Sequence, residues 1–296
     1  MNPFYSICIP TTDRGNTIYN TLCSVAQQSF RDFELIVVDC GSKDNTRQEI
    51  ERFFGSEIYN DNKFDYIYET RDYVPKTVED WNEPVKLARG KYIAMLEGDD
   101  QFLPSHLEDA YQILQKYSNI GMYAEGNQCH KREIIGIIEA SDWTEYAVSY
   151  KDVAPPSEAI FIRLNKDGHP FLYNDIDYEY APESELYVRI SLAGYDAFHS
   201  EKTGILRDIS IKDRTSWHYF VDRFTLLNMY RTNIAVNTYN YILEDNLTIT
   251  LLAAKSSRSI SNIINVCYNI IKKQSVNCFF YGIILALHKY LKMKRK

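Results

Sequence analysis

A chain of 296 residues is long enough to form one large domain, or one domain with a smaller appendage. Hydrophobic residues make up 45% and charged residues 25%, a globular balance that excludes a wholly disordered or collagen-like chain. Lysine and arginine number 33 against 40 acidic residues, and the resulting net charge of −7 disfavours broad phosphate binding. We therefore expect no nucleic-acid partner.

Cysteine usage and the apolar runs indicate the compartment. The six cysteines contain no C-x-x-C pair, so neither a zinc site nor a disulfide framework is expected. The first residues lack the basic region and long apolar region of a secretory signal. The longest apolar stretch, residues 278–287, is too short for a membrane-spanning helix. These features together predict a cytoplasmic protein.

Short apolar runs alternate with amphipathic segments over the first hundred residues, which is typical of βαβ units around a mostly parallel sheet. Four strands are predicted at residues 6–9, 34–38, 66–68 and 92–96. Apolar residues recur at helical spacing after Asn16 and again after Ser42 and Asp44, which predicts crossover helices between the first three strands.

The following residues predict a more mixed arrangement. A helix is expected from Pro104 to about Leu114, a strand at residues 134–138, and mixed strands and loops over residues 141–182. Residues 183–193 fit either a strand or a helix, and Gly194 as a terminator favours the helix. From about residue 222 the apolar spacing again suits helices.

Acidic residues gather after the predicted strands. In an open parallel sheet the carboxyl ends of the strands form the ligand-binding edge. Singly, Asp13, Asp39 and Asp44 are each more simply explained as turn or helix-cap residues. The segment Glu97-Gly98-Asp99-Asp100 is different, because three adjacent carboxylates repel one another unless a cation lies among them. We therefore expect a hard divalent cation there.

Three linked motifs carry a family resemblance. Residues 6–14 read SICIPTTDR, residues 33–46 read FELIVVDCGSKDNT, and residues 88–100 read ARGKYIAMLEGDD. In this order they resemble the opening of the family two GT-A glycosyltransferases, firmly over residues 4–115 and loosely to about 195. The resemblance implies an α/β fold of the GT-A (nucleotide-diphospho-sugar transferase) type, with a mostly parallel sheet flanked by helices.

The resemblance also implies a reaction and a donor site. Family members move a sugar from a nucleotide diphosphate to an acceptor hydroxyl with inversion, and a UDP-sugar is favoured here. Asp39 would bind the base, Pro10, Thr12 and Asp13 would line its pocket, and Arg71 would contact the base or the diphosphate. Asp99 would be the main ligand of Mn²⁺ or Mg²⁺ beside the nucleotide, with Glu97 and Asp100 as the further metal-site residues.

Inversion in one displacement needs a general base on the far side of the sugar. Glu183 falls on the position of the family's catalytic aspartate, and Glu185 is the alternative. This chain has Glu where Asp is usual at positions 183 and 97, and Pro182 replaces an acidic neighbour. The simpler interpretation is that both glutamates are solvated residues in the first turn of a helix, where the dipole favours them.

The C-terminal region suggests two alternatives. Apolar residues at helical spacing over 260–271, the apolar run 278–287 and five basic residues from Lys289 onward suit a helix lying on an anionic membrane surface. Packing against the catalytic domain suits them equally. We expect a GT-A domain over residues 1–220, with a nucleotide-binding half at 1–100 and an acceptor half at 101–220. A helical region at 221–296 follows.

The resemblance places the chain in bacterial surface polysaccharide synthesis, with a saccharide or lipid-linked saccharide as acceptor and peripheral contact with the inner face of the plasma membrane. Two alternatives remain. One is a catalytically degenerate GT-A protein that binds a nucleotide or sugar. The other is a sugar nucleotidyltransferase, which would need a glycine-rich basic loop where this chain has residues 10–14.

Overall fold

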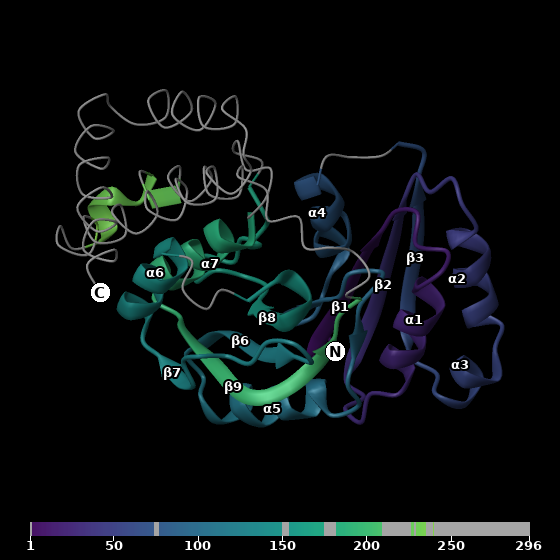
Figure 1. The fold of residues 1–296 in the computed structure, drawn as a ribbon, viewed down its shortest axis with the longest axis horizontal. Helices are drawn as coiled ribbons and strands as arrows, with labels where there is room; N and C mark the ends of the chain where they lie inside the picture. Colours follow the sequence, from purple (N-terminus) through teal and green to yellow (C-terminus); the bar gives the residue numbers. More distant parts are fainter. Residues whose placement is uncertain are drawn as a thin grey trace, which may run out of the picture.

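The computed structural model describes residues 2–73, 77–149, 154–174, 182–208, 226–227, 229–234 and 239. Nine strands in this part of the chain form one sheet, in the order β3-β2-β1-β4-β8-β6-β9-β5, and β7 pairs with β9. Figure 1 shows the sheet with helices packed on both of its faces. The α/β fold expected from the resemblance is therefore observed.

The first half of the sheet is parallel throughout and confirms the four predicted strands. They are β1 (Tyr5–Thr11), β2 (Phe33–Cys40), β3 (Asp65–Arg71) and β4 (Tyr92–Met95). The helices between them are α1 (Ile18–Ala26), α2 (Thr46–Phe54), α3 (Glu57–Asp61) and α4 (Thr77–Leu87). Because all four strands run the same way, their carboxyl ends lie along a single edge of the sheet.

Alternate side chains of β1 enter two separate cores, as the period of two in a strand requires. Tyr5, Ile7 and Ile9 pack with residues of α1, α2 and α5, whereas Cys8 packs on the other face with residues of α4, α6 and α7. All four side chains are fully buried. A strand covered on both faces has an almost continuous apolar sequence, which explains why these strands were easy to predict.

The second half of the sheet is mixed. Its elements are β5 (Gln101–Phe102), α5 (His106–Lys116), β6 (Ile120–Asn127), β7 (Gly136–Ile138), α6 (Ala140–Ser149), η1 (Pro156–Glu158), β8 (Ala159–Ile162), α7 (Pro182–Leu192) and β9 (Asp196–Leu206). Strand β8 runs antiparallel to both β4 and β6, and β6 runs parallel to β9. Helices α5 and α7 confirm two predictions.

Three expectations for this half need correction. Residues 140–149 form helix α6 instead of strands and loops, because Trp143, Ala147 and Val148 bury one helical face. Strand β7 covers only the last three residues of the predicted strand at 134–138. The long strands β6 and β9 were not predicted, since β6 buries polar residues such as Glu125 and Asn127 whose partners are distant in sequence.

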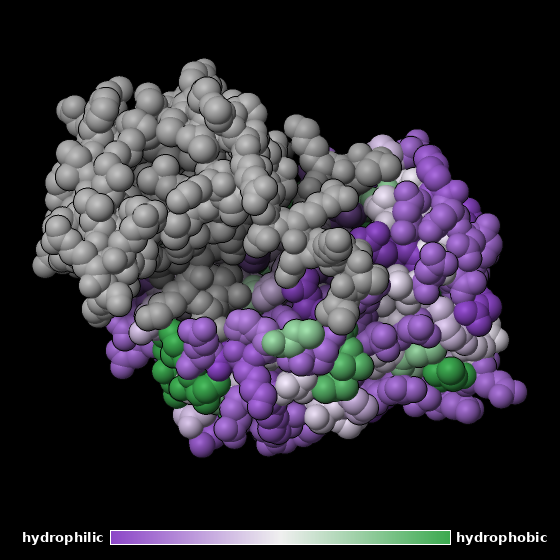
Figure 2. Space-filling model, viewed as in Figure 1, coloured by the Kyte–Doolittle hydropathy of each residue, from purple (hydrophilic) through white to green (hydrophobic). Residues whose placement is uncertain are grey.

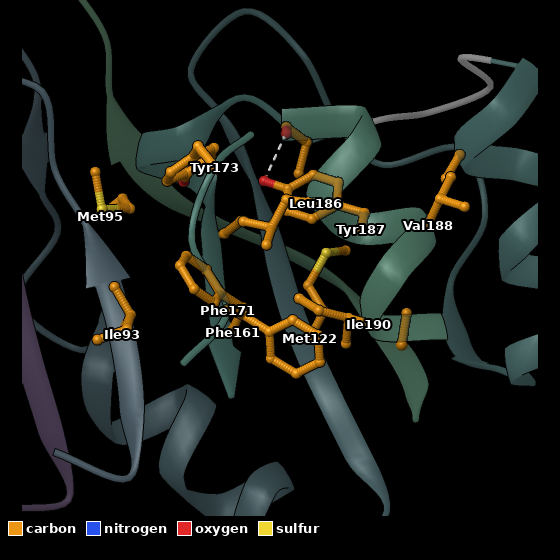
Figure 3. Packing of buried hydrophobic residues seen from close by; sticks show 14 of the residues in the cluster. Ile93, Met95, Met122, Phe161, Phe171, Tyr173, Leu186, Tyr187, Val188 and Ile190 are labelled. Atoms are coloured by element: carbon orange, nitrogen blue, oxygen red, sulfur yellow. Dashed lines mark hydrogen bonds between the residues drawn. The ribbon is translucent and has the colours of Figure 1, made fainter. Parts of the chain in front are cut away.

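Helix α7 is fixed on the sheet by an apolar core. Figure 3 shows Leu186 and Tyr187 of α7 above Met122 of β6 and Phe161 of β8, with Ile190 of α7 beside Met122. The Tyr187 hydroxyl also donates a hydrogen bond to the carbonyl oxygen of Ala154 over 3.1 Å. These contacts fix the position of the first turn of α7 relative to the sheet.

The expected boundary at residue 220 and nearly all of the expected helical region 221–296, including its basic end, lie outside the described residues. Within the described ranges, no helix has the length and apolar character needed to cross a membrane. Figure 2 shows a mainly hydrophilic surface for those ranges on this face. Among the exposed apolar side chains of the described residues are Ile135, directly before β7, and Ile137 of β7, each about half exposed.

Candidate active site

The loops after β1 and β2 are tied together into one rim at the carboxyl edge of the sheet. Asp39, the penultimate residue of β2, is almost fully buried and accepts hydrogen bonds from the backbone N–H and the hydroxyl of Ser42. Thr12 donates its hydroxyl to the carbonyl oxygen of Cys40 over 3.1 Å, and Asp13 accepts from the N–H of Lys43 over 2.6 Å. The structure therefore brings Thr12, Asp13 and Asp39 together.

Two residues in this rim have distinct backbone roles. Asp13 has a φ of 52°, the left-handed region that aspartate tolerates better than most residues. Pro10 lies inside β1 beside Val38 of β2 and is buried. The turn at Asp13 redirects the chain toward α1.

Arg71 reaches the same rim from the end of β3, where it pairs with Cys40 in the strand register. Its guanidinium forms ion pairs with Glu69 over 2.8 Å and with Glu83 of α4 over 2.7 Å. Glu83 thus orients Arg71 from the helix that follows it. Sequence reasoning did not assign a role to Glu83, because its position twelve residues after Arg71 gives no signal of the contact.

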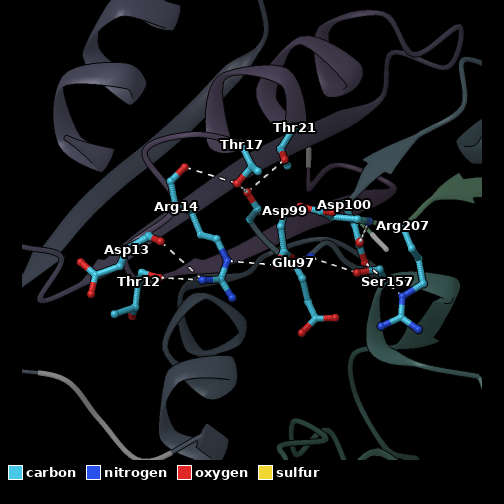
Figure 4. Close-up of polar contacts among 12 residues, drawn as sticks. Thr12, Asp13, Arg14, Thr17, Thr21, Glu97, Asp99, Asp100, Ser157 and Arg207 are labelled. Carbon is cyan, nitrogen blue, oxygen red and sulfur yellow. Dashed lines mark hydrogen bonds and ion pairs between the residues drawn. The ribbon is translucent and has the colours of Figure 1, made fainter. Parts of the chain in front are cut away.

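The three carboxylates after β4 lie in three different environments. Figure 4 shows the side chains of Asp99 and Glu97 directed apart, with Arg14 beside Asp99 and Arg207 beside Asp100. The Arg14 Nε lies 3.1 Å from the Asp99 Oδ2. The Arg207 Nε lies 3.9 Å from the Asp100 Oδ2, and the N–H of Asp208 donates to the other oxygen of Asp100.

Glu97 is surrounded mainly by negative charge. Burial, followed by the charges of Asp100 and Asp99, raises the pKa of Glu97 to about 8. Arg207 opposes this effect, and the carboxylate of Glu183 adds to it. Burial likewise raises the pKa of Asp100, against the hydrogen bond from Ser157 and the charge of Arg207. The cluster therefore has more negative charge than its basic neighbours offset.

This excess charge is what a divalent cation would compensate, and carboxylate oxygens are the ligands that Mg²⁺ and Mn²⁺ prefer. Within the described ranges, however, no three His, Cys, Asp or Glu side chains are grouped so as to hold a metal by themselves. Such cations are commonly held by one or two carboxylates together with substrate phosphates and water. The residues present fit a metal that binds jointly with a diphosphate.

The two candidate bases on α7 differ sharply. Glu185 is 1% exposed and accepts hydrogen bonds from Arg189, from the Asn174 amide over 3.0 Å and from the Tyr230 hydroxyl over 2.8 Å. Glu183 lies in the first helical turn at 9% exposure, close enough to Glu97 for the two charges to interact. Both are buried, so neither is the solvated helix residue of the simpler interpretation.

Sequence reasoning did not assign a role to two basic residues of the site. Arg14 stands inside the first motif, and its place directly after the β1 turn was a signal that it reaches the ligand-binding edge. Arg207 follows β9 and lies more than a hundred residues from Asp100. No spacing rule connects those two positions, so only the folded chain reveals the contact.

The first half of the chain is similar in sequence to a known family. Residues 6–133 match the sequence model described as "Glycosyl transferase family 2". Over these residues the chain is therefore similar in sequence to the family 2 glycosyltransferases. The matched residues include the rim formed by the loops after β1 and β2 and the Glu97 to Asp100 segment, whereas Glu183 and Glu185 lie beyond them.

Two curated relatives share part of the chain. WfgD of Escherichia coli, named as a UDP-Glc:alpha-D-GlcNAc-diphosphoundecaprenol beta-1,3-glucosyltransferase, is 26% identical over 173 residues, which cover 57% of this chain and 65% of WfgD. The uncharacterized glycosyltransferase RP339 of Rickettsia prowazekii is 30% identical over 118 residues, which cover 40% of this chain and 34% of RP339. The matches thus span about two thirds and one third of these relatives.

Solved structures share the fold over nearly the entire length. TarS of S. aureus, residues 1–349 with UDP, superposes with a TM-score of 0.69 at 15% identity, covering 98% of this chain and 89% of that one. The mannosyltransferase PcManGT of Pyrobaculum calidifontis, with GDP-Man and Mn²⁺, gives a TM-score of 0.61 at 15% identity, covering 98% and 88%. This chain therefore shares the fold of both proteins.

Proposed function

We propose that this protein is an inverting glycosyltransferase that moves a sugar from a UDP-sugar to the hydroxyl of a saccharide acceptor. The observation that carries the proposal is the arrangement at one edge of the sheet. The donor-side rim with Asp39, the acidic segment with Asp99, and Glu183 at the start of α7 all meet there. A donor, a charge-compensating cation and a base would thereby act on one sugar carbon.

The donor nucleotide would lie on the rim formed by the first two loops. Asp39 offers a carboxylate acceptor to a base N–H, while Pro10, Thr12 and Asp13 shape the walls of the pocket. Arg71 would approach the nucleotide from β3, in an orientation set by Glu83. A UDP-sugar is the donor that the name of WfgD and the UDP complex of TarS support.

Asp99 would hold Mn²⁺ or Mg²⁺ together with the diphosphate, Glu97 would add its negative charge to the metal site without contacting Asp99, and Asp100 would stay bound to the backbone of Asp208. The cation would offset the charge that grows on the departing diphosphate. The segment is held in place by Thr17 and Thr21, whose hydroxyls donate to the carbonyl oxygen of Gly98 over 2.9 and 3.2 Å.

Glu183 is our choice of general base in preference to Glu185. In the displacement, the acceptor oxygen forms the new bond to the sugar carbon as the bond to the diphosphate breaks, and the hydroxyl proton passes to a carboxylate. Glu185 already accepts from three neighbouring side chains and is poorly disposed to take that proton. Glu183 lies near the acidic segment, and its negative charge contributes to the raised pKa of Glu97.

The acceptor is proposed to be a lipid-linked saccharide in the synthesis of a bacterial surface polysaccharide. The support is the name of WfgD, whose acceptor is a sugar on a diphosphate lipid. Such an acceptor would place the enzyme at the cytoplasmic face of the membrane. The domain division at residue 220 and membrane contact through residues 221–296 remain parts of this proposal.

A transfer assay tests the proposal directly. The full chain is incubated with radiolabelled UDP-glucose or UDP-GlcNAc, a diphospholipid-linked GlcNAc acceptor and Mn²⁺, and lipid-extractable label is counted. We expect label transfer that stops when EDTA is added and returns with excess Mn²⁺. Binding of UDP without transfer to any acceptor would instead favour the degenerate, binding-only alternative. Failure to bind any nucleoside diphosphate would overturn the proposal.

A further inference from the structure

The side chain of Arg14 spans the gap between the donor-side rim and the acidic segment. Its Nε lies 3.1 Å from the Asp99 Oδ2, and its Nη1 donates to the carbonyl oxygen of Thr12 over 3.3 Å. Figure 4 shows the guanidinium lying between the loop after β1 and the Asp99 carboxylate. A positive group thus occupies the carboxylate that the proposed function assigns to a divalent cation.

The backbone of Arg14 is held in place independently of this ion pair. Its N–H donates to the Thr46 hydroxyl over 2.7 Å, and its carbonyl oxygen accepts from the N–H groups of Thr17 and Ile18 over 2.9 Å. The next residue, Gly15, donates to Asp44 over 2.9 Å. The side chain, by contrast, is 38% exposed, so it can change rotamer while the loop stays fixed.

Asp99 and Asp100 differ in how firmly each arginine is bound. Asp100 is 3% exposed and is also held by the N–H of Asp208, so its contact with Arg207 belongs to the interior. The Asp99 side chain is 12% exposed, and the contact described for its carboxylate is with Arg14, whose side chain is 38% exposed. An ion pair with a solvent-exposed partner is weaker and more easily exchanged than a fully buried one. Asp99 is therefore the carboxylate whose partner can be replaced.

We propose that Arg14 is an exchangeable counter-ion: it pairs with Asp99 until a divalent cation binds there, and its guanidinium then binds the diphosphate of the donor. This rests on the proposed function. Two cations on one carboxylate repel each other, so binding of the metal releases the arginine. A guanidinium matches a phosphate with parallel N–H donors, so the incoming diphosphate is its natural next partner.

The exchange makes two predictions of opposite sign for one substitution. Arg14→Met keeps the length of the side chain but removes its charge. Without nucleotide, Mn²⁺ has one competitor fewer, and we expect its dissociation constant to fall about two- to five-fold. With Mn²⁺ saturating, UDP loses a charged partner, and we expect its dissociation constant to rise about ten-fold.

The first quantity is measured by the electron paramagnetic resonance signal of free Mn²⁺ during titration of the protein. The second is measured by calorimetric titration with UDP. The matched control is Arg52→Met on α2, which removes another arginine from an exposed ion pair, here with Glu49, and should change neither constant. Arg14→Lys keeps the charge and should restore most of the UDP affinity. Thermal melting verifies that each variant is folded.

The opposite signs exclude a purely structural explanation, because damage to the fold would weaken both ligands together. If Arg14→Met weakens Mn²⁺ and UDP alike, or changes neither, the exchange is overturned. If the unaltered protein binds Mn²⁺ but no nucleoside diphosphate, the proposed function fails and the donor half of the exchange fails with it. The competition between Arg14 and Mn²⁺ is then still decided by the first titration.

Discussion

Buried carboxylates at the two ends of the parallel strands have pKa values shifted in opposite directions. At the amino ends, Glu34 of β2 is 1% exposed and accepts from the Ser6 hydroxyl over 2.6 Å and from the Arg89 N–H over 2.7 Å, with the Arg89 guanidinium on its other oxygen. Burial raises its pKa, but these hydrogen bonds outweigh that effect and leave the pKa lowered. At the carboxyl ends, the pKa of Glu97 is raised to about 8.

The difference shows which end of the sheet is built for stability and which for binding. A carboxylate whose partners are all within the chain contributes to folding and has little capacity left for a ligand. A carboxylate beside others of like charge is costly to bury and is stabilised when a cation arrives. On this basis, substitutions at the amino ends should lower stability, and those at the carboxyl ends should lower activity.

The largest effect is expected for Asp99→Asn. Removal of the charge that would hold the cation should lower the transfer rate at saturating donor by about 10²–10³-fold, while the melting temperature stays nearly constant. The radiolabel assay and a thermal melt measure the two quantities. Asp109→Asn, which breaks a surface ion pair with Lys202, is the matched control and should change neither. An unaltered rate in Asp99→Asn would remove the metal role from this segment.

A second contrast lies within helix α7. Glu183→Gln removes the proposed base and should lower kcat about 10²-fold or more with little change in KM for the donor. Glu185→Gln should mainly destabilise the protein, by about 1–3 kcal/mol, because it disturbs a buried acceptor of three side chains. Rate assays and urea unfolding of both variants separate the roles. The reverse pattern would make Glu185 the base.

The opposite end of the sheet should show the opposite response. Glu34→Gln replaces a carboxylate that accepts charge-assisted hydrogen bonds from Arg89, and we expect a loss of about 2 kcal/mol in the free energy of unfolding. Activity per folded molecule should stay constant. The control is Glu51→Gln, which removes an exposed i,i+4 pair with Arg47 and should cost far less, because solvent screens that pair. Comparable losses in the two variants would contradict the assigned role of Glu34.

The sequence predicted the parallel half of the fold well because its signals are local. The strands around Ile7 and Val37 are continuous apolar runs buried on both faces, and the helices between them have one apolar face. Strand β6 was not predicted because Glu125 and Asn127 are polar yet buried. Glu125 is hydrogen-bonded to His106 of α5, and Asn127 is hydrogen-bonded to Glu158 before β8, and no local pattern reveals these partners.

The same distinction applies to the site. Asp39 and Asp99 follow predicted strands, so their location at the same edge followed from the topology of a parallel sheet. The choice between Glu183 and Glu185 did not follow, since it depends on which carboxylate the side chains of Arg189 and Tyr230 occupy. Contacts between distant segments decide such cases, and spacing along the chain does not encode them.

The smallest expected effect is the pH dependence of the contribution from Glu34. Because the folded-state pKa of Glu34 is lowered, its stabilising contribution is complete above the unfolded pKa of about 4.3 and is lost as the pH falls through the folded pKa. The difference in unfolding free energy between the unaltered protein and Glu34→Gln should therefore be constant from pH 6 to 8 and shrink below about pH 4. Urea unfolding across this pH range measures the difference, and the Glu51→Gln variant serves as a reference whose difference should vary less with pH. A difference that persists unchanged into acid would mean that Glu34 stabilises the amino ends of the strands through packing alone, and the contrast with Glu97 would then no longer rest on charge.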